Sequence, residues 1–129
     1  IIYNKDILSP NFHCSGYNCV WTEDYTEEWL LSAEGNRIVS CSRSGGSKGW
    51  QLYSISRWTR EDGRKLKEQL ELEFEIRRNR QIYWDDVPMF CYFGEYELEM
   101  YPMNRQDVKE IDNIKELAAI DKNYLKYII

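Results

Sequence analysis

The sequence has little histidine, no excess of basic charge and no long apolar run. Its 129 residues include one histidine, and 17 lysines and arginines stand against 22 acidic residues, which gives a formal net charge of -5. Proteins that bind the nucleic-acid backbone usually carry a basic surface, and a membrane-spanning helix needs about 20 apolar residues in a row. We therefore expect neither a nucleic-acid partner nor a membrane.

Motifs for catalysis or cofactor binding are also scarce. The glycine-rich segment 42–49 lacks the G-x-x-x-x-G-K-[ST] spacing of a nucleotide-binding P-loop. A zinc site usually has four ligands in paired short spacings, and His13, Cys14 and Cys19 have no fourth ligand close in the sequence. We expect no cofactor, and these three residues are the candidates if a metal binds.

The four cysteines could form two disulfides with three possible connectivities. A chain of this length can bury a sufficient core without disulfides, and lysine and glutamate are plentiful while threonine is scarce. We therefore expect free thiols and a cytoplasmic protein, with secretion as the alternative.

The composition is that of a globular protein, with 43% hydrophobic and 30% charged residues. Together with the length, it predicts a single domain that spans residues 1–129. Ten tyrosines and five tryptophans raise the aromatic content to 15%. Aromatic side chains of this kind serve either the core or a binding surface.

Residues 49–76 carry the pattern of a β-hairpin that turns at Asp62-Gly63. An Asp-Gly pair between two apolar-rich runs is a strong hairpin signal, and side chains alternate between the two faces of a strand. One predicted face collects the apolar side chains of Tyr53, Ile55, Leu70, Leu72, Phe74 and Ile76. The other face collects Trp50, Leu52, Trp58, Glu71, Glu73 and Glu75.

Other segments predict further strands and a helix. Residues 29–33 and 37–41 predict a hairpin that turns at residues 34–36, residues 81–84 and the apolar run 89–93 predict strands, and residues 95–101 alternate as a half-buried strand does. Asn104 is a suitable N-cap for a C-terminal helix. The resulting fold class is α+β: a mainly antiparallel sheet of about five to seven strands in hairpins or a meander, with the C-terminal helix packed on one face.

The acidic, aromatic face of the predicted hairpin suggests binding rather than catalysis. Three carboxylates cannot all be buried without partners, and tryptophans are enriched at interaction hot spots. We expect a non-catalytic binding module that uses this face to contact a basic protein partner.

Two alternatives remain open. In the first, the chain binds a small ligand or a glycan, and the 42–49 loop closes over it; Arg43 and Lys48 are binding residues that could help this loop to hold an anion. In the second, it is a hydrolase or nuclease that uses paired carboxylates.

Overall fold

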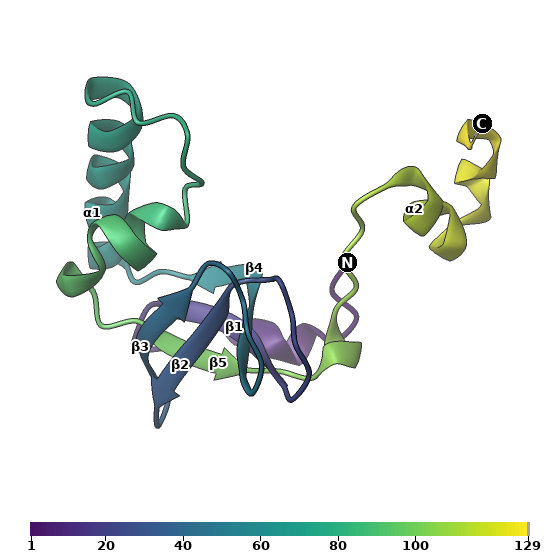
Figure 1. Cartoon of the computed structure of the whole chain (residues 1–129), viewed down its shortest axis with the longest axis horizontal. Coiled ribbons are helices and arrows are strands. Elements are labelled where there is room, and N and C mark those ends of the chain that lie inside the picture. The colour runs from purple at the N-terminus through teal and green to yellow at the C-terminus, as the bar shows by residue number, and fades with distance from the viewer. Residues whose placement is uncertain (129) are drawn as a thin grey trace. The chain divides into compact units, whose positions relative to one another are not determined.

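Five strands form a closed barrel in the computed structural model, which describes residues 1–128 (Figure 1). The strands are β1 (Gly16–Thr22), β2 (Leu30–Glu34), β3 (Arg37–Ser42), β4 (Gly49–Arg57) and β5 (Glu99–Pro102). Their order around the barrel is β1-β4-β2-β3-β5. The pair β1 and β5 is parallel and the other pairs are antiparallel. The predicted α+β class with a mainly antiparallel sheet is confirmed.

The hairpin predicted around residues 34–36 is also confirmed. It joins β2 to β3, with Glu34 opposite Arg37. Gly35 has a φ of 59°, in the left-handed region that glycine adopts without steric cost. The valine and isoleucine of β3 suit a pleated strand, so the turn signal and the flanking residues agree here.

The hairpin predicted at Asp62-Gly63 is wrong. The first half, β4, is a strand, but the second half is the helix α1 (Arg60–Glu71), followed by the π-helical turn η2 (Leu72–Ile76). Thr59 is the N-cap of α1, and its hydroxyl accepts a hydrogen bond from the Asp62 N–H at 3.2 Å. The residues after Gly63 are mostly strong helix formers, so capping and propensity outweigh the Asp-Gly turn signal.

Consequently, the two faces predicted for that hairpin do not exist. Glu71 ends α1 and forms an exposed ion pair with Lys67 at 3.9 Å, and Glu75 is exposed. Glu73 is only 4% exposed and accepts a hydrogen bond from the Tyr92 hydroxyl at 2.8 Å. The carboxylates therefore belong to a helical segment rather than to a sheet face shared with tryptophans.

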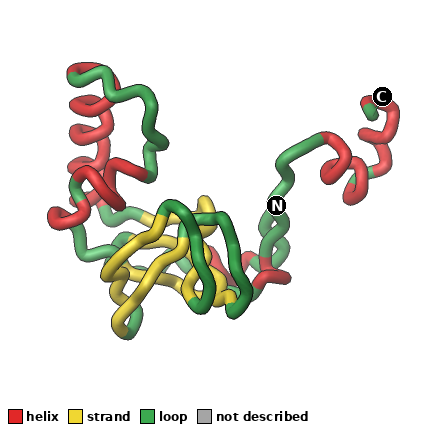
Figure 2. Tube along the Cα trace, viewed as in Figure 1, coloured by secondary structure: helices red, strands yellow, loops and turns green. Residues whose placement is uncertain are grey.

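The chain between β4 and β5 is helical or irregular, as the secondary-structure colours of Figure 2 show. The strands predicted at 81–84 and 89–93 are wrong: residues 83–86 form a turn, and η3 (Val87–Cys91) is a π-helical turn with Pro88 in its first positions. The short 3-10 helix η4 (Phe93–Glu95) follows. Of the strand predicted at 95–101, the alternation of buried and exposed residues is correct, but strand pairing begins at Glu99.

The core contains apolar residues from the strands, from η3 and from the segment that leads into β5. Its members are Tyr17, Cys19, Leu31, Ile38, Met89, Tyr96, Leu98 and Met100. Burying a large apolar side chain contributes about 1.5–3 kcal/mol, so this set can hold η3 against the strands.

The chain divides into two compact units, one of residues 10–103 and one that joins residues 1–9 to the segment from Asn104 onward. The second unit contains the 3-10 helices η1 (Lys5–Leu8), η5 (Arg105–Asp107) and η6 (Lys122–Tyr127) and the helix α2 (Ile114–Ile120). Ile2 forms a β-bridge with Val108. The predicted C-terminal helix is thus present but begins ten residues after its expected N-cap, Asn104, and the sheet face that it was expected to cover is not formed.

Within the described residues, no helix combines the length and the apolar character needed to cross a membrane.

Candidate functional site

The turn of residues 83–86 is the centre of the candidate site. The Asp86 N–H donates to the Tyr83 carbonyl at 3.1 Å, and the Tyr83 N–H donates to Asp86 Oδ2 at 2.9 Å. The Asp86 side chain thus closes the turn on the chain that precedes it. The residues between, Trp84 and Asp85, are presented by a short, doubly hydrogen-bonded segment.

Aromatic rings from β1, from the residue before β2 and from the residue after β4 lie beside this turn. Trp84 stacks on Tyr17, with ring centroids 6.4 Å apart and an interplanar angle of 23°, and it meets Trp58 edge-on at 6.3 Å. Tyr83 meets Trp29 edge-on at 6.4 Å. Tyr83 is 73% exposed and Trp84 39%, so both rings are open to a ligand. We call the set Trp29, Trp58, Tyr83, Trp84 and Asp85 the aromatic turn site.

Asp85 is the acidic member of the aromatic turn site. It is half-buried, and the Tyr17 hydroxyl donates to its Oδ1 at 2.7 Å. Burial raises the pKa of Asp85, the hydrogen bond from Tyr17 opposes that rise, and the neighbouring Asp86 adds to it. Among residues 1–128, no lysine, arginine or histidine forms an ion pair with Asp85.

A carboxylate in these surroundings favours a cationic ligand. Burial disfavours the charged form of the carboxylate, and a nearby cation stabilises that form. The faces of tryptophan and tyrosine rings attract a cation as well, and aromatic cages are used to bind quaternary ammonium groups. The aromatic turn site therefore has the chemistry to bind an amine or ammonium group.

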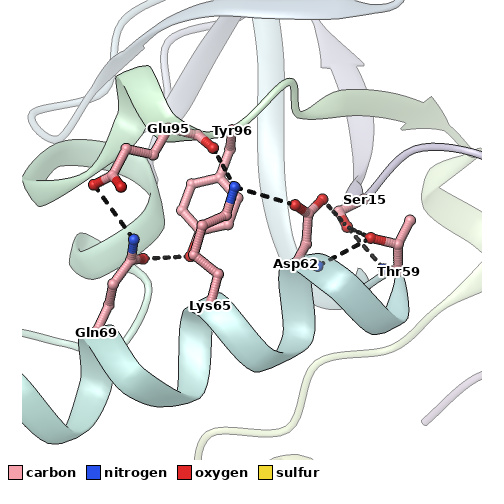
Figure 3. Close-up of polar contacts among 7 residues, drawn as sticks. All are labelled: Ser15, Thr59, Asp62, Lys65, Gln69, Glu95 and Tyr96. Carbon is pink, nitrogen blue, oxygen red and sulfur yellow. Dashed lines mark hydrogen bonds and ion pairs between the residues drawn. The ribbon is translucent and has the colours of Figure 1, made fainter.

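A second feature is a cleft of about 450 Å³ at the start of α1. It is lined by His13, Cys14, Thr59, Glu61, Asp62, Lys65, Glu95 and Glu97. Figure 3 shows the polar contacts beside it: the Ser15 hydroxyl donates to Asp62 at 2.7 Å, and the Lys65 ammonium lies 3.5 Å from the same carboxylate. Lys65 also donates to the Glu95 carbonyl.

Tyr96 connects the cleft to the aromatic turn site. The Lys65 ammonium lies 4.6 Å from the centre of the Tyr96 ring, and the Tyr96 hydroxyl donates to Gln69 (Figure 3). Trp58 meets the same ring edge-on, with centroids 5.8 Å apart. The cleft and the aromatic site are thus neighbours within the unit of residues 10–103.

The predicted metal candidates are not brought together. His13 and Cys14 line the cleft, whereas Cys19 is fully buried in β1. Within residues 1–128, no group of three or more histidine, cysteine, aspartate or glutamate side chains could hold a metal ion.

All four cysteines, Cys14, Cys19, Cys41 and Cys91, are free thiols. Burial raises the pKa of the Cys41 thiol to about 12.

The structure separates the predicted partner-binding residues. Trp50 meets Trp21 edge-on at 5.3 Å, and Leu52 packs against the core. Lys48 is exposed with a φ of 54° in the loop before β4, and Arg43 forms an ion pair with Asp86. Trp58 alone of this set joins the aromatic turn site. A basic protein partner stays a prediction, but the hairpin face on which this prediction was based is not formed.

Sequence reasoning missed Tyr83, Trp84 and Asp85 as site residues. The Tyr-Trp-Asp-Asp run is visible in the sequence, but adjacent residues on a strand point to opposite faces, so two neighbouring acids suggest a turn rather than a shared site. The turn is real. The missing information was that the rings of Tyr17, Trp29 and Trp58, distant in the sequence, contact this turn.

Two known enzymes are similar to this chain, although no protein-family model matches it. Over 125 residues, 97% of its length, the chain is 24% identical to a 2-aminoethylphosphonate cytidylyltransferase of Lancefieldella rimae and covers 50% of that protein. The solved structure of a CTP:phosphocholine cytidylyltransferase from Streptococcus pneumoniae matches 87% of this chain with a TM-score of 0.68 and 19% identity, and 49% of that chain is covered. The chain thus spans about half the length of the proteins it matches.

These similarities contradict the expected function. Both similar proteins are named as nucleotidyl-transferring enzymes, so the description of this chain as a non-catalytic binding protein is wrong. Neither name supports the glycan-binding or the hydrolase and nuclease alternatives. The physical source of the error is the hairpin that was predicted at Asp62-Gly63, since the acidic, aromatic face was derived from it.

Proposed function

We propose that this chain is the acceptor-recognising part of a cytidylyltransferase, and that the aromatic turn site binds the cationic end of the acceptor. The observation that carries the proposal is Asp85, a half-buried carboxylate that follows Trp84 in the turn, accepts a hydrogen bond from the Tyr17 hydroxyl and forms no ion pair within residues 1–128. A cation would supply the missing partner.

The names of the two similar enzymes support this choice of ligand. One acts on 2-aminoethylphosphonate and the other on phosphocholine. These molecules share a positively charged nitrogen at one end and a phosphonate or phosphate group at the other. The nitrogen end is the part for which Trp84, Tyr83 and Asp85 have matching chemistry.

In cytidylyl transfer to such an acceptor, an oxygen of its phosphonate or phosphate group attacks the α-phosphorus of CTP, and pyrophosphate leaves. The nitrogen end takes no part in these bond changes. Its binding holds the acceptor in a fixed position, which lowers the entropic part of the barrier. We assign to the aromatic turn site this positioning role, and a cytoplasmic location, where CTP is available, is part of the proposal.

The chemistry of the site suggests how it would treat two kinds of nitrogen. A primary ammonium can donate hydrogen bonds to Asp85, and charge-assisted hydrogen bonds are about twice as strong as neutral ones. A trimethylammonium group cannot donate and would rely on the ring faces, which contribute about 0.5–2 kcal/mol for each cation–π contact.

Calorimetric titration of the chain tests the proposal. We expect 2-aminoethylphosphonate and phosphocholine to bind, and propylphosphonate, which lacks the nitrogen, to bind at least about tenfold more weakly because it forgoes the contact with Asp85. Tyr83→Ala should weaken binding of both cationic ligands. Tyr25→Ala, which removes a tyrosine of similar exposure (69%) outside the site, is the matched control. Equal binding of propylphosphonate would contradict the proposal.

A further inference from the structure

Arg43 holds the turn of residues 83–86 from the loop between β3 and β4. Its Nε donates to Asp86 Oδ1 at 2.8 Å, and its Nη2 lies 2.5 Å from the same oxygen. The other carboxylate oxygen, Oδ2, accepts from the Tyr83 N–H at 2.9 Å. Asp86 is therefore shared between the loop that carries Arg43 and the turn that carries Trp84 and Asp85.

The burial of Asp86 makes this ion pair consequential. Asp86 is 4% exposed, whereas the Arg43 side chain is 53% exposed. A buried carboxylate without a partner is strongly disfavoured. Arg43 supplies the opposite charge that compensates the burial of the Asp86 carboxylate, which closes the turn.

Arg43 also makes a contact with an aromatic ring. Its guanidinium lies over the Phe90 ring, 3.7 Å from the ring centre, and Phe90 meets Trp29 edge-on at 5.3 Å. One side chain thus touches both the residue that closes the turn and the residue that supports Trp29.

We infer that Arg43 is a positioning residue for the aromatic turn site, acting through Asp86 on Trp84 and Asp85 and through Phe90 on Trp29. The inference rests on the proposed function, because it concerns the ligand that the site binds. The ion pair of Arg43 is with Asp86 and its ring contact is with Phe90, and neither of these residues belongs to the aromatic turn site.

The direction in which Arg43→Gln changes cation affinity distinguishes a positioning role of Arg43 from a purely electrostatic effect of its charge. Replacing Arg43 with glutamine removes a positive charge near a site for cations, and by Coulomb's law alone this should tighten cation binding. If Arg43 positions the site, the same substitution weakens cation binding because the turn is no longer held. The two accounts predict opposite directions.

Choline is the probe for this test because it has the cationic nitrogen and no phosphate. We expect Arg43→Gln to weaken choline and phosphocholine binding by the same factor, about tenfold. Arg43→Lys should fall between, since lysine keeps the charge but not the planar group that stacks on Phe90. Arg37→Gln is the matched control: it removes the exposed ion pair with Glu97 at 3.6 Å and should leave both affinities unchanged.

A second measurement follows the turn itself. Hydrogen exchange of the Tyr83 amide, which Asp86 protects, should accelerate in Arg43→Gln and stay unchanged in Arg37→Gln. In an Asp86→Asn background, Arg43→Gln should add little further loss of choline binding, because its main route to the site is already weakened.

The outcomes are distinct. Unchanged or tighter choline binding in Arg43→Gln overturns the inference, and so does a loss confined to phosphocholine, which would mean that Arg43 contacts the phosphate. If the unsubstituted chain binds neither probe, the proposed function fails. In that case, unchanged exchange of the Tyr83 amide in Arg43→Gln would overturn the inference separately, and faster exchange would support Arg43 as the residue that holds the turn.

Discussion

The cleft at the start of α1 and the aromatic turn site differ in how their charges are satisfied. In the cleft, Asp62 accepts from Ser15 and pairs with Lys65, and Lys65 is held further by the Glu95 carbonyl. In the aromatic turn site, Asp85 accepts from the neutral Tyr17 hydroxyl and has no cationic partner within residues 1–128. The cleft's central charges stabilise the fold, whereas the charge of Asp85 remains available to a ligand.

The neighbouring residues Asp85 and Asp86 show the same contrast between a carboxylate with a cationic partner and one without. Asp86 has Arg43 and the Tyr83 amide, and it closes the turn. Asp85 has neither. A carboxylate that already has a cation fixes structure, and the carboxylate beside it, lacking one, can recognise a cation.

Removing the charge of Asp85 should have the largest effect. We expect Asp85→Asn to weaken choline binding more than tenfold, about 2 kcal/mol, because the cation loses its counter-charge in a half-buried site. The free energy of unfolding should fall little or rise, since the substitution also removes the repulsion from Asp86. Titration calorimetry measures the affinity and thermal unfolding measures the stability. Undiminished choline binding would contradict the claim that the charge of Asp85 is available to a ligand.

Lowering the pH should also weaken choline binding, because protonation removes the charge of Asp85. The pKa of Asp85 lies above the ordinary aspartate value of 3.8, and only the charged form attracts a cation. Choline affinity should therefore fall as the pH drops through that raised pKa, and the fall should be absent in Asp85→Asn. Choline has no titrating group in this range, so a pH dependence that survives in the variant would assign the effect to another residue.

A substitution beside the cleft should instead change the stability of the protein. Ser15 is fully buried; its hydroxyl donates to Asp62 and accepts from the Thr59 N–H at 2.8 Å. Ser15→Ala should lower the free energy of unfolding by about 1–3 kcal/mol, because it removes the acceptor of the Thr59 N–H and one hydrogen-bond donor to Asp62. Denaturant unfolding measures the loss, and choline affinity should stay the same at temperatures where the variant is folded.

The smallest expected effect comes from a substitution in α1, the helix at whose start the cleft lies. Gly63 lies inside α1, and a Cβ at this position meets no atom within 4 Å. Gly63→Ala should raise the free energy of unfolding by about 0.5–1 kcal/mol, because alanine loses less backbone entropy in a helix. A destabilised Gly63→Ala protein would mean that residues 60–71 are not helical in solution. Choline binding should not change.

The two glycine-containing turn signals show how much of the fold the sequence could predict. Gly35 lies between residues that suit strands, and the predicted hairpin is correct. Gly63 stands after a threonine cap and before a run of helix formers, and the predicted hairpin is wrong. Local signals conflict at Gly63, where the Thr59 cap and the helix propensity of the following residues outweigh the Asp-Gly turn signal.

The candidate site was less predictable than the fold. Trp58 was proposed as a binding residue, but through a sheet face that does not exist. Tyr83, Trp84 and Asp85 gain their significance from Tyr17 and Trp29, which are more than 50 residues away in the sequence. Periodicity and turn propensity are local properties, so they could not predict these contacts.

The most direct test of the central claim uses the five tryptophans as reporters. In a spectrum of the ¹⁵N-labelled indole groups, assigned with single tryptophan-to-phenylalanine variants, choline should shift the resonances of Trp29, Trp58 and Trp84. The resonances of Trp21 and Trp50, which pack against each other outside the site, should not move. Shifts confined to Trp21 and Trp50, or no shift at saturating choline, would contradict the claim that the turn of residues 83–86 recognises a cationic acceptor.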